Sequence, residues 1–227
     1  MNNFFATPTD VWGDDAVMLT SVGIGIIVAA IILLIAIALF VYNRKEKAST
    51  KITTKQLVFS AMAMALATVC SMIKLFEMPM GGSVTLLSML FIVLIAYWYG
   101  PVAGIATGMA YGLLQFVLEP IFYTLPQMLV DYPLAFGALG LAGFLSSRKY
   151  GLQIGYVLGV LGRFVFAFLS GVLFFASYAP EGMHPAIYST LYNGSYLLAE
   201  AIITLIVISI PPVHKALKSM KGLATGN

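Results

Sequence analysis

Long apolar runs separated by short polar breaks make up most of the chain. A helix that crosses the hydrocarbon core of a bilayer needs about 20 mostly apolar residues. Seven stretches approach that length: residues 16–42, 57–75, 84–99, 102–118, 126–145, 152–176 and 185–210. Gly100-Pro101 and Pro211-Pro212 interrupt the pattern, because proline cannot continue the preceding helix. The pattern predicts an all-α integral membrane protein with seven transmembrane helices.

The composition agrees with this prediction and excludes several function classes. The chain is 60% hydrophobic and 9% charged, with a mean hydropathy of +0.96, whereas a soluble domain has roughly 25% charged residues. Cys70 is the only cysteine, so an intrachain disulfide and a cysteine-based zinc site are both excluded. The net charge of +3 is small and concentrated in loops, which argues against a nucleic-acid partner.

The positions of the basic residues predict the orientation in the membrane. Lysine and arginine accumulate in cytoplasmic loops. Three clusters follow the first, fifth and seventh apolar stretches: residues 44–55, residues 148–149 and residues 215–221. Seven crossings place all three on one face, which we expect to be cytoplasmic. The N-terminus is then outside and the C-terminus inside. Residues 1–15 lack the basic start of a cleavable signal peptide, so the first helix should be retained.

The basic linker divides the chain into two parts. Residues 1–50 comprise the N-terminus, an extra transmembrane helix and the linker, and residues 51–227 form a six-helix block. The first helix is apolar all round, as expected for a helix that faces lipid. The other six are rich in glycine, alanine and serine, which allow helices to approach closely in lipid. We therefore expect the function to lie in the six-helix block.

Three ionisable residues stand inside the apolar stretches, where charge is costly and marks functional or paired sites. Asp131 lies near the outer end of the fifth stretch, which favours contact with a ligand. Arg163 lies roughly 18 Å from the cytoplasmic end of the sixth stretch, counted at 1.5 Å per residue, and Glu200 lies at a similar depth in the seventh. Two interpretations of Arg163 and Glu200 remain open. They form a structural ion pair, or they are the reactive groups of an intramembrane enzyme.

Polar and aromatic residues gather at the outer ends of the helices. An interfacial aromatic belt explains part of this pattern, but it does not require a carboxylate or an asparagine. An acid within aromatic walls can hold an organic cation through charge pairing and cation–π contacts. The sequence thus predicts an outward-facing pocket for a small aromatic or cationic ligand. The chain contains no P-loop motif, so we do not expect it to hydrolyse ATP by that route.

Two alanine pairs in the second stretch have the small-xxx-small spacing that brings helices together. They are Ala61 with Ala65 and Ala63 with Ala67. The spacing is compatible with packing inside the block and with contact to another protein.

Four motifs together resemble a known family. They are MPMGGSVTLLSML, YGLLQFVLEP, LPQMLVDYPLAFGALGLAGF and GRFVFAFLSGVLFFASYAPEGMHPAIYSTLYN, and they fall within residues 51–212. In order and spacing they resemble the substrate-binding (S) subunit of energy-coupling-factor (ECF) vitamin transporters, specifically the thiamine-specific family. The extra N-terminal helix lies outside that family's usual pattern.

The resemblance implies a function and partners. It implies a six-helix subunit of the bacterial cytoplasmic membrane that binds thiamine on its extracellular side, without a cofactor or catalysis of its own. A coupling membrane protein and two cytoplasmic ATP-binding subunits would drive uptake. The implied substrate-binding positions are Asp131, Tyr132, Tyr123, Gly171, Phe175, Tyr188 and Asn193, with the Asp131 carboxylate facing the thiazolium. Ala61 and Ala65 resemble the surface that meets the coupling protein.

The chain departs from the family pattern at two positions. Ala167 stands where the family often has histidine, and Phe175 stands where it has a stacking tryptophan. A thiamine precursor or another small cationic heterocycle is therefore an alternative ligand.

Overall fold

The computed structural model describes residues 6–8, 17–19, 21–22, 53–78 and 82–226. Most of the expected first helix, residues 16–42, lies outside these residues and stays a prediction. The predicted start of this helix at residue 16 is wrong. Residues 17–19 form strand β2 (Val17–Leu19), which pairs antiparallel with β1 (Ala6–Pro8).

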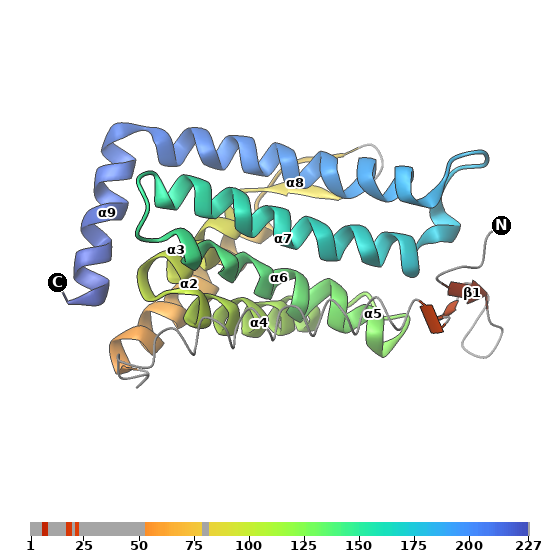
Figure 1. The fold of residues 1–227 in the computed structure, drawn as a ribbon, viewed down its shortest axis with the longest axis horizontal. Coiled ribbons are helices and arrows are strands. Elements are labelled where there is room, and N and C mark those ends of the chain that lie inside the picture. Colours follow the sequence, from red (N-terminus) through yellow and green to blue (C-terminus); the bar gives the residue numbers. More distant parts are fainter. Residues whose placement is uncertain (1–5, 9–16, 20, 23–52, 79–81, 227) are drawn as a thin grey trace.

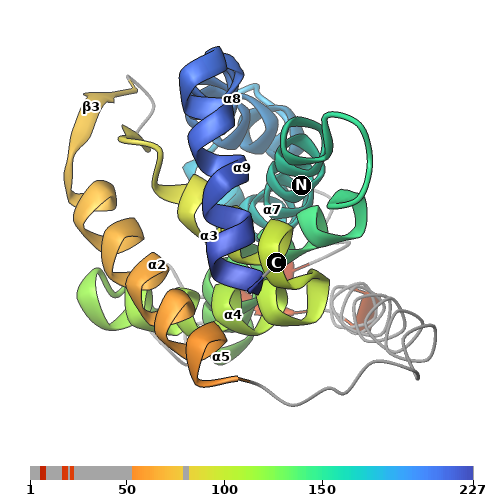
Figure 2. The same ribbon diagram turned by 90° about the vertical axis from the view of Figure 1, so that its left-hand side faces the viewer.

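The six-helix block is confirmed within residues 53–226. Its members are α2 (Thr54–Met72), α3 (Ser88–Tyr99), α4 (Pro101–Leu118), the helical segment Leu125–Leu145, α7 (Gly151–Leu173) and α8 (Pro185–Ser209). Figure 1 shows α4, the segment Leu125–Leu145, α7 and α8 running side by side along the long axis, and Figure 2 shows α2 inclined to them. All but α3 are long and apolar enough to cross a membrane; α3 has only 12 residues.

A short hairpin replaces part of the predicted second and third helices. Strand β3 (Lys74–Glu77) pairs antiparallel with β4 (Ser83–Thr85). Helix α2 consequently ends at Met72, and α3 begins at Ser88 rather than at residue 84. At 1.5 Å per residue, α3 is about 18 Å long, which is shorter than a hydrocarbon core of about 30 Å. Its first turn is buried inside the block.

The segment from residue 125 to residue 145 changes its helical geometry along its length. Helix α5 (Leu125–Leu129) leads into the π-helical turn η1 (Val130–Leu134), followed by α6 (Ala135–Gly137) and the 3₁₀ stretch η2 (Ala138–Leu145). Pro133 lies inside η1. Because proline has no backbone N–H, it breaks the α-helical hydrogen-bond ladder here. Such π-helical turns are frequent at functional sites, and this one carries Asp131 and Tyr132.

Glycines on α4 hold this segment in place. Gly104, Gly108 and Gly112 recur every four residues along the face of α4 that meets it. A Cβ atom at Gly108 would overlap the Phe136 carbonyl, and one at Gly112 would overlap the Tyr132 carbonyl. The small residues allow the two backbones to touch, as in close helix packing in lipid. The backbone that carries Asp131 and Tyr132 is thus fixed by direct contact with α4.

A further helix, α9 (Pro211–Thr225), follows the last transmembrane helix. The apolar pattern predicts no helix after residue 210. Instead of stopping helical structure, Pro211 occupies the first turn of α9, where its missing N–H costs nothing. Figures 1 and 2 show α9 lying across one end of the block. The Tyr99 hydroxyl donates a hydrogen bond to the Ala224 carbonyl over 2.9 Å and ties α9 to α3.

Two of the basic clusters meet at this end. The Lys221 ammonium lies 4.0 Å from the centre of the Tyr97 ring and donates to the Ser146 carbonyl over 3.2 Å. Burial lowers the pKa of Lys221. Ser146 belongs to the turn that continues into Arg148 and Lys149. The structure therefore brings these clusters to one end of the block, as the positive-inside argument requires. That this end faces the cytoplasm stays a prediction.

Candidate functional site

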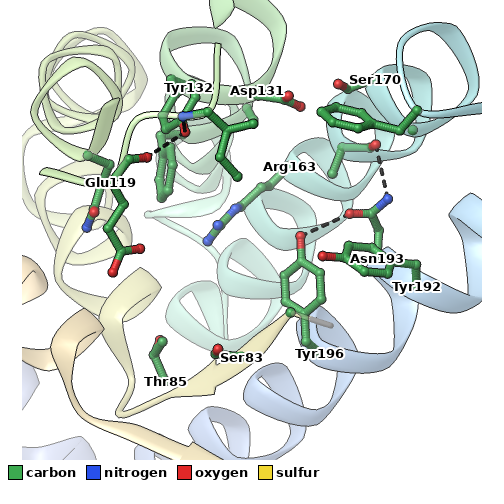
Figure 3. A pocket seen from close by; sticks show the side chains of 18 of the residues that line it. Ser83, Thr85, Glu119, Asp131, Tyr132, Arg163, Ser170, Tyr192, Asn193 and Tyr196 are labelled. Atoms are coloured by element: carbon green, nitrogen blue, oxygen red, sulfur yellow. Dashed lines mark hydrogen bonds between the residues drawn. The ribbon is translucent and has the colours of Figure 1, made fainter. Parts of the chain in front are cut away.

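A cavity of about 650 Å³ lies within the six-helix block. Its walls come from the β3–β4 hairpin, α4, the segment Leu125–Leu145, α7 and α8. All seven residues expected to bind substrate line this one cavity: Tyr123, Asp131, Tyr132, Gly171, Phe175, Tyr188 and Asn193. Figure 3 shows several of them converging from separate helices. Their contact with a substrate stays a prediction.

Gln127 positions the Asp131 carboxylate. Its side-chain nitrogen donates to Asp131 Oδ2 over 2.7 Å and to the Ile121 carbonyl over 3.2 Å, while its oxygen accepts from the Tyr123 backbone N–H over 3.1 Å. Gln127 itself is fully buried. One amide therefore fixes both the carboxylate and the loop that precedes α5. This role was not predicted, although Gln127 precedes Asp131 by about one helical turn in the sequence.

The Tyr132 hydroxyl forms hydrogen bonds with two backbone groups of the protein. It donates to the Glu119 carbonyl over 2.8 Å and accepts from the Ile121 N–H over 2.9 Å. The ring of Tyr132 packs edge-on against Phe116, with the ring centres 5.1 Å apart. Tyr132 thus ties the π-helical turn to the end of α4, and what it offers the cavity is its aromatic ring.

Three tyrosines on α8 form an aromatic wall of the cavity. Tyr188, Tyr192 and Tyr196 follow one another at four-residue spacing, and their ring centres are 5.9 Å and 6.0 Å apart. Of the three, only Tyr188 was predicted as a substrate-binding residue. The i, i+4 spacing that puts all three on one helix face was present in the sequence.

Asn193 joins α7 to α8 beneath this wall. Its side-chain nitrogen donates to the Ala167 carbonyl over 3.1 Å and to Ser189, and its oxygen accepts from the Tyr196 hydroxyl over 3.0 Å. Gly171 lies against the same groups, because a Cβ atom there would overlap the Ser189 and Asn193 side chains. The position of the Asn193 side chain therefore requires a residue without a side chain at position 171.

Aromatic residues from two loops meet at the end of the cavity remote from α9. The Tyr123 and Tyr178 hydroxyls are hydrogen-bonded over 2.7 Å. The Phe175 ring lies 5.3 Å from the Tyr123 ring and 6.0 Å from the Tyr178 ring, measured between centres. Tyr178 was not predicted. It connects the loop after α7 to the loop before α5.

Glu200 does not form the ion pair with Arg163 that the sequence left open. Its carboxylate accepts from the hydroxyls of Thr85 and Ser88 over 2.6 Å and 3.2 Å, and from the backbone N–H groups of Thr85 and Met89 over 3.2 Å and 3.3 Å. Among the described residues the one salt bridge is Lys74–Glu77, which is largely exposed. Glu200 instead satisfies the buried beginning of α3.

The Arg163 guanidinium lies over the Phe136 ring, 4.1 Å from its centre. Arg163 also lines the cavity, and Figure 3 shows its side chain extending into the space among the labelled residues. The lining of described residues includes three carboxylates, Asp131, Glu119 and Glu200, and two cationic side chains, Arg163 and Lys74. This excess of acid suits a cationic ligand. No cluster that could hold a metal ion occurs among the described residues.

The two alanine pairs on α2 have different surroundings. Ala63 and Ala67 are buried in the contact of α2 with the rest of the block. Ala61 and Ala65 are exposed, and they share this outer surface with exposed Leu57, Met62 and Leu66. The buried pair packs inside the block, and the exposed pair leaves a small-residue surface on the outside of α2. Contact of the exposed pair with a coupling protein stays a prediction.

Comparison with known proteins identifies the family. The family described as thiamine transporter protein (Thia_YuaJ) matches residues 57–220. The chain belongs to this family. It is 36% identical over 148 residues to the thiamine transporter ThiT of Bacillus subtilis, covering 59% of this chain and 77% of the relative. It is 28% identical over 137 residues to the ThiT of Lacticaseibacillus paracasei, covering 52% of this chain and 68% of the relative.

A solved structure shares the fold. The ThiT structure from Listeria monocytogenes superposes with a TM-score of 0.58 at 24% identity, covering 75% of this chain and 94% of that one. Family membership and the apolar helices together make the chain a multi-pass membrane protein of a transporter family. The family match begins at residue 57 and so excludes the N-terminal part, as the resemblance implied.

Proposed function

We propose that this chain is the thiamine-binding S subunit of an ECF-type transporter and that its cavity holds thiamine. The observation that carries the proposal is the Asp131 carboxylate, positioned by Gln127 inside an aromatic-walled cavity of the membrane domain. Family membership and the relatives named thiamine transporters support the choice of ligand.

The chemistry of thiamine suits these walls. Thiamine joins a permanently cationic thiazolium ring to an aminopyrimidine ring. A carboxylate pairs with the cation, and tyrosine and phenylalanine faces attract it through their quadrupoles. The cavity of about 650 Å³ lies within the range of roughly 300–1,000 Å³ typical of small-molecule sites. We assign Asp131 to the thiazolium, with Tyr132, Phe175 and Tyr188 forming the aromatic surroundings.

Uptake would depend on partner proteins. We propose that a coupling membrane protein and two ATP-binding subunits drive release to the cytoplasm, and that this chain hydrolyses no ATP itself. The exposed face of α2 around Ala61 and Ala65 is the surface we assign to the coupling protein. The cavity then opens outside, with the N-terminus outside and α9 in the cytoplasm.

A second ligand of the same class is a thiamine precursor or another small cationic heterocycle. Ala167 favours this alternative, because it lines the cavity without a side-chain hydrogen-bonding group. An intramembrane enzyme that uses Arg163 and Glu200 is less favoured. Four hydrogen bonds, from Thr85, Ser88 and Met89, already occupy the Glu200 carboxylate.

The test is to identify the small molecule that co-purifies with the protein by mass spectrometry. Calorimetric titration with thiamine, thiamine monophosphate and the isolated aminopyrimidine fragment then ranks the candidates. The proposal predicts that thiamine co-purifies and binds more tightly than the fragment. Tighter binding of a precursor would favour the alternative, and no binding of any cationic heterocycle would refute the proposed function.

A further inference from the structure

Arg163 presents hydrogen-bond donors to the cavity without an acceptor. Its guanidinium stacks on Phe136 at 4.1 Å, and among the described residues it makes no hydrogen bond and no ion pair. Stacking covers a face of the planar group and leaves its N–H donors, which point outward in the plane, available. Unpaired donors inside a membrane domain are costly, so a bound ligand that brings acceptors to this place gains affinity.

The surrounding charges favour a neutral acceptor over an anionic one. Glu200 and Glu119 line the same cavity as Arg163, and the carboxylates outnumber the cationic side chains among its described lining residues. An anionic ligand group placed deep in the cavity would be repelled by these carboxylates. An uncharged ring nitrogen accepts from the guanidinium without that repulsion.

The positions of Arg163 and Asp131 separate the two ends of a ligand. Asp131 lies on η1 near α5, toward the end of the cavity where Tyr123 and Tyr178 meet. Arg163 lies near the middle of α7, two helical turns before Gly171. The cavity therefore offers a carboxylate toward the end where Tyr123 and Tyr178 meet and a guanidinium farther from that end.

We infer that Arg163 binds the ring nitrogens of the aminopyrimidine of thiamine, and so selects for that ring and orients the ligand. The thiazolium then lies by Asp131 and the aminopyrimidine lies deeper, by Phe136 and Arg163. This inference rests on the proposed function. It adds a residue that recognises the uncharged half of the ligand.

A pair of ligands separates the two roles. The compound 3-benzyl-5-(2-hydroxyethyl)-4-methylthiazolium keeps the cationic thiazolium of thiamine but replaces the aminopyrimidine by phenyl. A charge-assisted hydrogen bond contributes about 1.5–3 kcal/mol, which corresponds to about 10- to 100-fold in affinity. We expect Arg163→Met to weaken thiamine binding by about that factor and to leave binding of the benzyl compound nearly unchanged, as measured by calorimetry in detergent.

The control is Asp131→Asn, which should weaken both ligands alike because both carry the thiazolium. Binding of the benzyl compound also reports that Arg163→Met is folded. If that variant binds neither ligand, Arg163→Lys, which keeps the charge but loses the planar donors, should weaken thiamine alone.

Equal weakening of both ligands by the Arg163 substitutions would overturn the inference, and so would no weakening at all. A larger loss for thiamine monophosphate than for thiamine in Arg163→Met would also overturn it, because Arg163 would then bind the phosphate. If the wild-type protein binds no thiamine, the proposed function itself fails, which is a distinct result.

Discussion

The Glu200 carboxylate on α8 accepts a hydrogen bond from the backbone N–H of Met89, in the first turn of α3. The first N–H groups of any helix lack partners within the helix, and inside a membrane water cannot supply them. Glu200 meets this need for α3, which begins inside the block. Its negative charge also interacts favourably with the positive end of the helix dipole. Glu200 of α8 therefore caps the N-terminus of α3 and does not pair with Arg163.

Glu200→Ala should therefore destabilise the protein. It removes the acceptor of the Thr85 and Met89 backbone N–H groups, and it leaves the Thr85 and Ser88 hydroxyls bonded only to each other. Buried unsatisfied groups cost about 1–3 kcal/mol each, so we expect a loss of about 3 kcal/mol or more. Thermal unfolding of the purified protein, followed by circular dichroism, measures it. Glu181→Ala, which removes an exposed carboxylate from a loop, is the matched control. Equal melting temperatures for the two variants would refute the capping role.

Gly171→Ala should weaken thiamine binding while the protein stays folded. The new methyl group overlaps Ser189 and Asn193, and it must displace side chains that line the cavity. Overpacking costs about 1–3 kcal/mol, which we expect to appear mainly in binding. Gly194→Ala on α8 is the control, because the nearest atom to its Cβ lies at an ordinary 3.7 Å. Titration with thiamine compares them. The same affinity in both would contradict the account.

The two alanine pairs of α2 make separable predictions. Ala67→Leu overpacks a fully buried position and should cost about 1–3 kcal/mol of stability. Ala65→Leu, on the exposed face, should leave both stability and thiamine binding unchanged in the isolated subunit. It should nevertheless reduce uptake of labelled thiamine by cells that contain the whole transporter. Unimpaired uptake would show that this face of α2 does not meet the coupling protein.

Removing the Tyr178 hydroxyl should speed the release of ligand. The Tyr123–Tyr178 hydrogen bond joins two loops at the end of the cavity remote from α9. A neutral hydrogen bond contributes about 0.5–1.5 kcal/mol, so Tyr178→Phe should raise the dissociation rate by about 2- to 10-fold. Stopped-flow displacement of bound thiamine measures this rate. Tyr150→Phe, an exposed position that begins α7 at the opposite end, is the control. Identical rates would show that the hydrogen bond does not retain the ligand.

Long apolar runs predicted the six-helix block because their length is set by the bilayer. The hairpin β3–β4 could not be predicted in this way, since residues 84–87 are nearly as apolar as the helix that follows. Helix α9 was missed for a related reason. Pro211 was taken as an end, yet proline is equally suited to begin a helix. The glycines at residues 104, 108 and 112 were visible as a four-residue repeat, and they indicate the contact that fixes Asp131.

The sequence was sufficient to predict which residues line the candidate site, but not which hydrogen bonds hold them. The sequence gathers the seven predicted residues at one end of the helices, and the cavity contains all of them. The three hydrogen-bonding partners of Glu200 lie more than one hundred residues away in the sequence. Composition cannot specify such a pairing, so the sequence left an ion pair with Arg163 open, and the structure excludes it.

The central claim is that Asp131 pairs with the thiazolium of thiamine. Two opposite charges near a protein surface interact by about 4 kcal/mol at 4 Å, and part of this survives the loss of hydration. Asp131→Asn removes the charge at nearly constant shape, and its amide can still contact Gln127. Calorimetric titration with thiamine measures the affinity directly. The account predicts a loss of about 30-fold or more, roughly 2 kcal/mol, in a protein with an unchanged melting temperature. An unchanged affinity in the folded variant would contradict it.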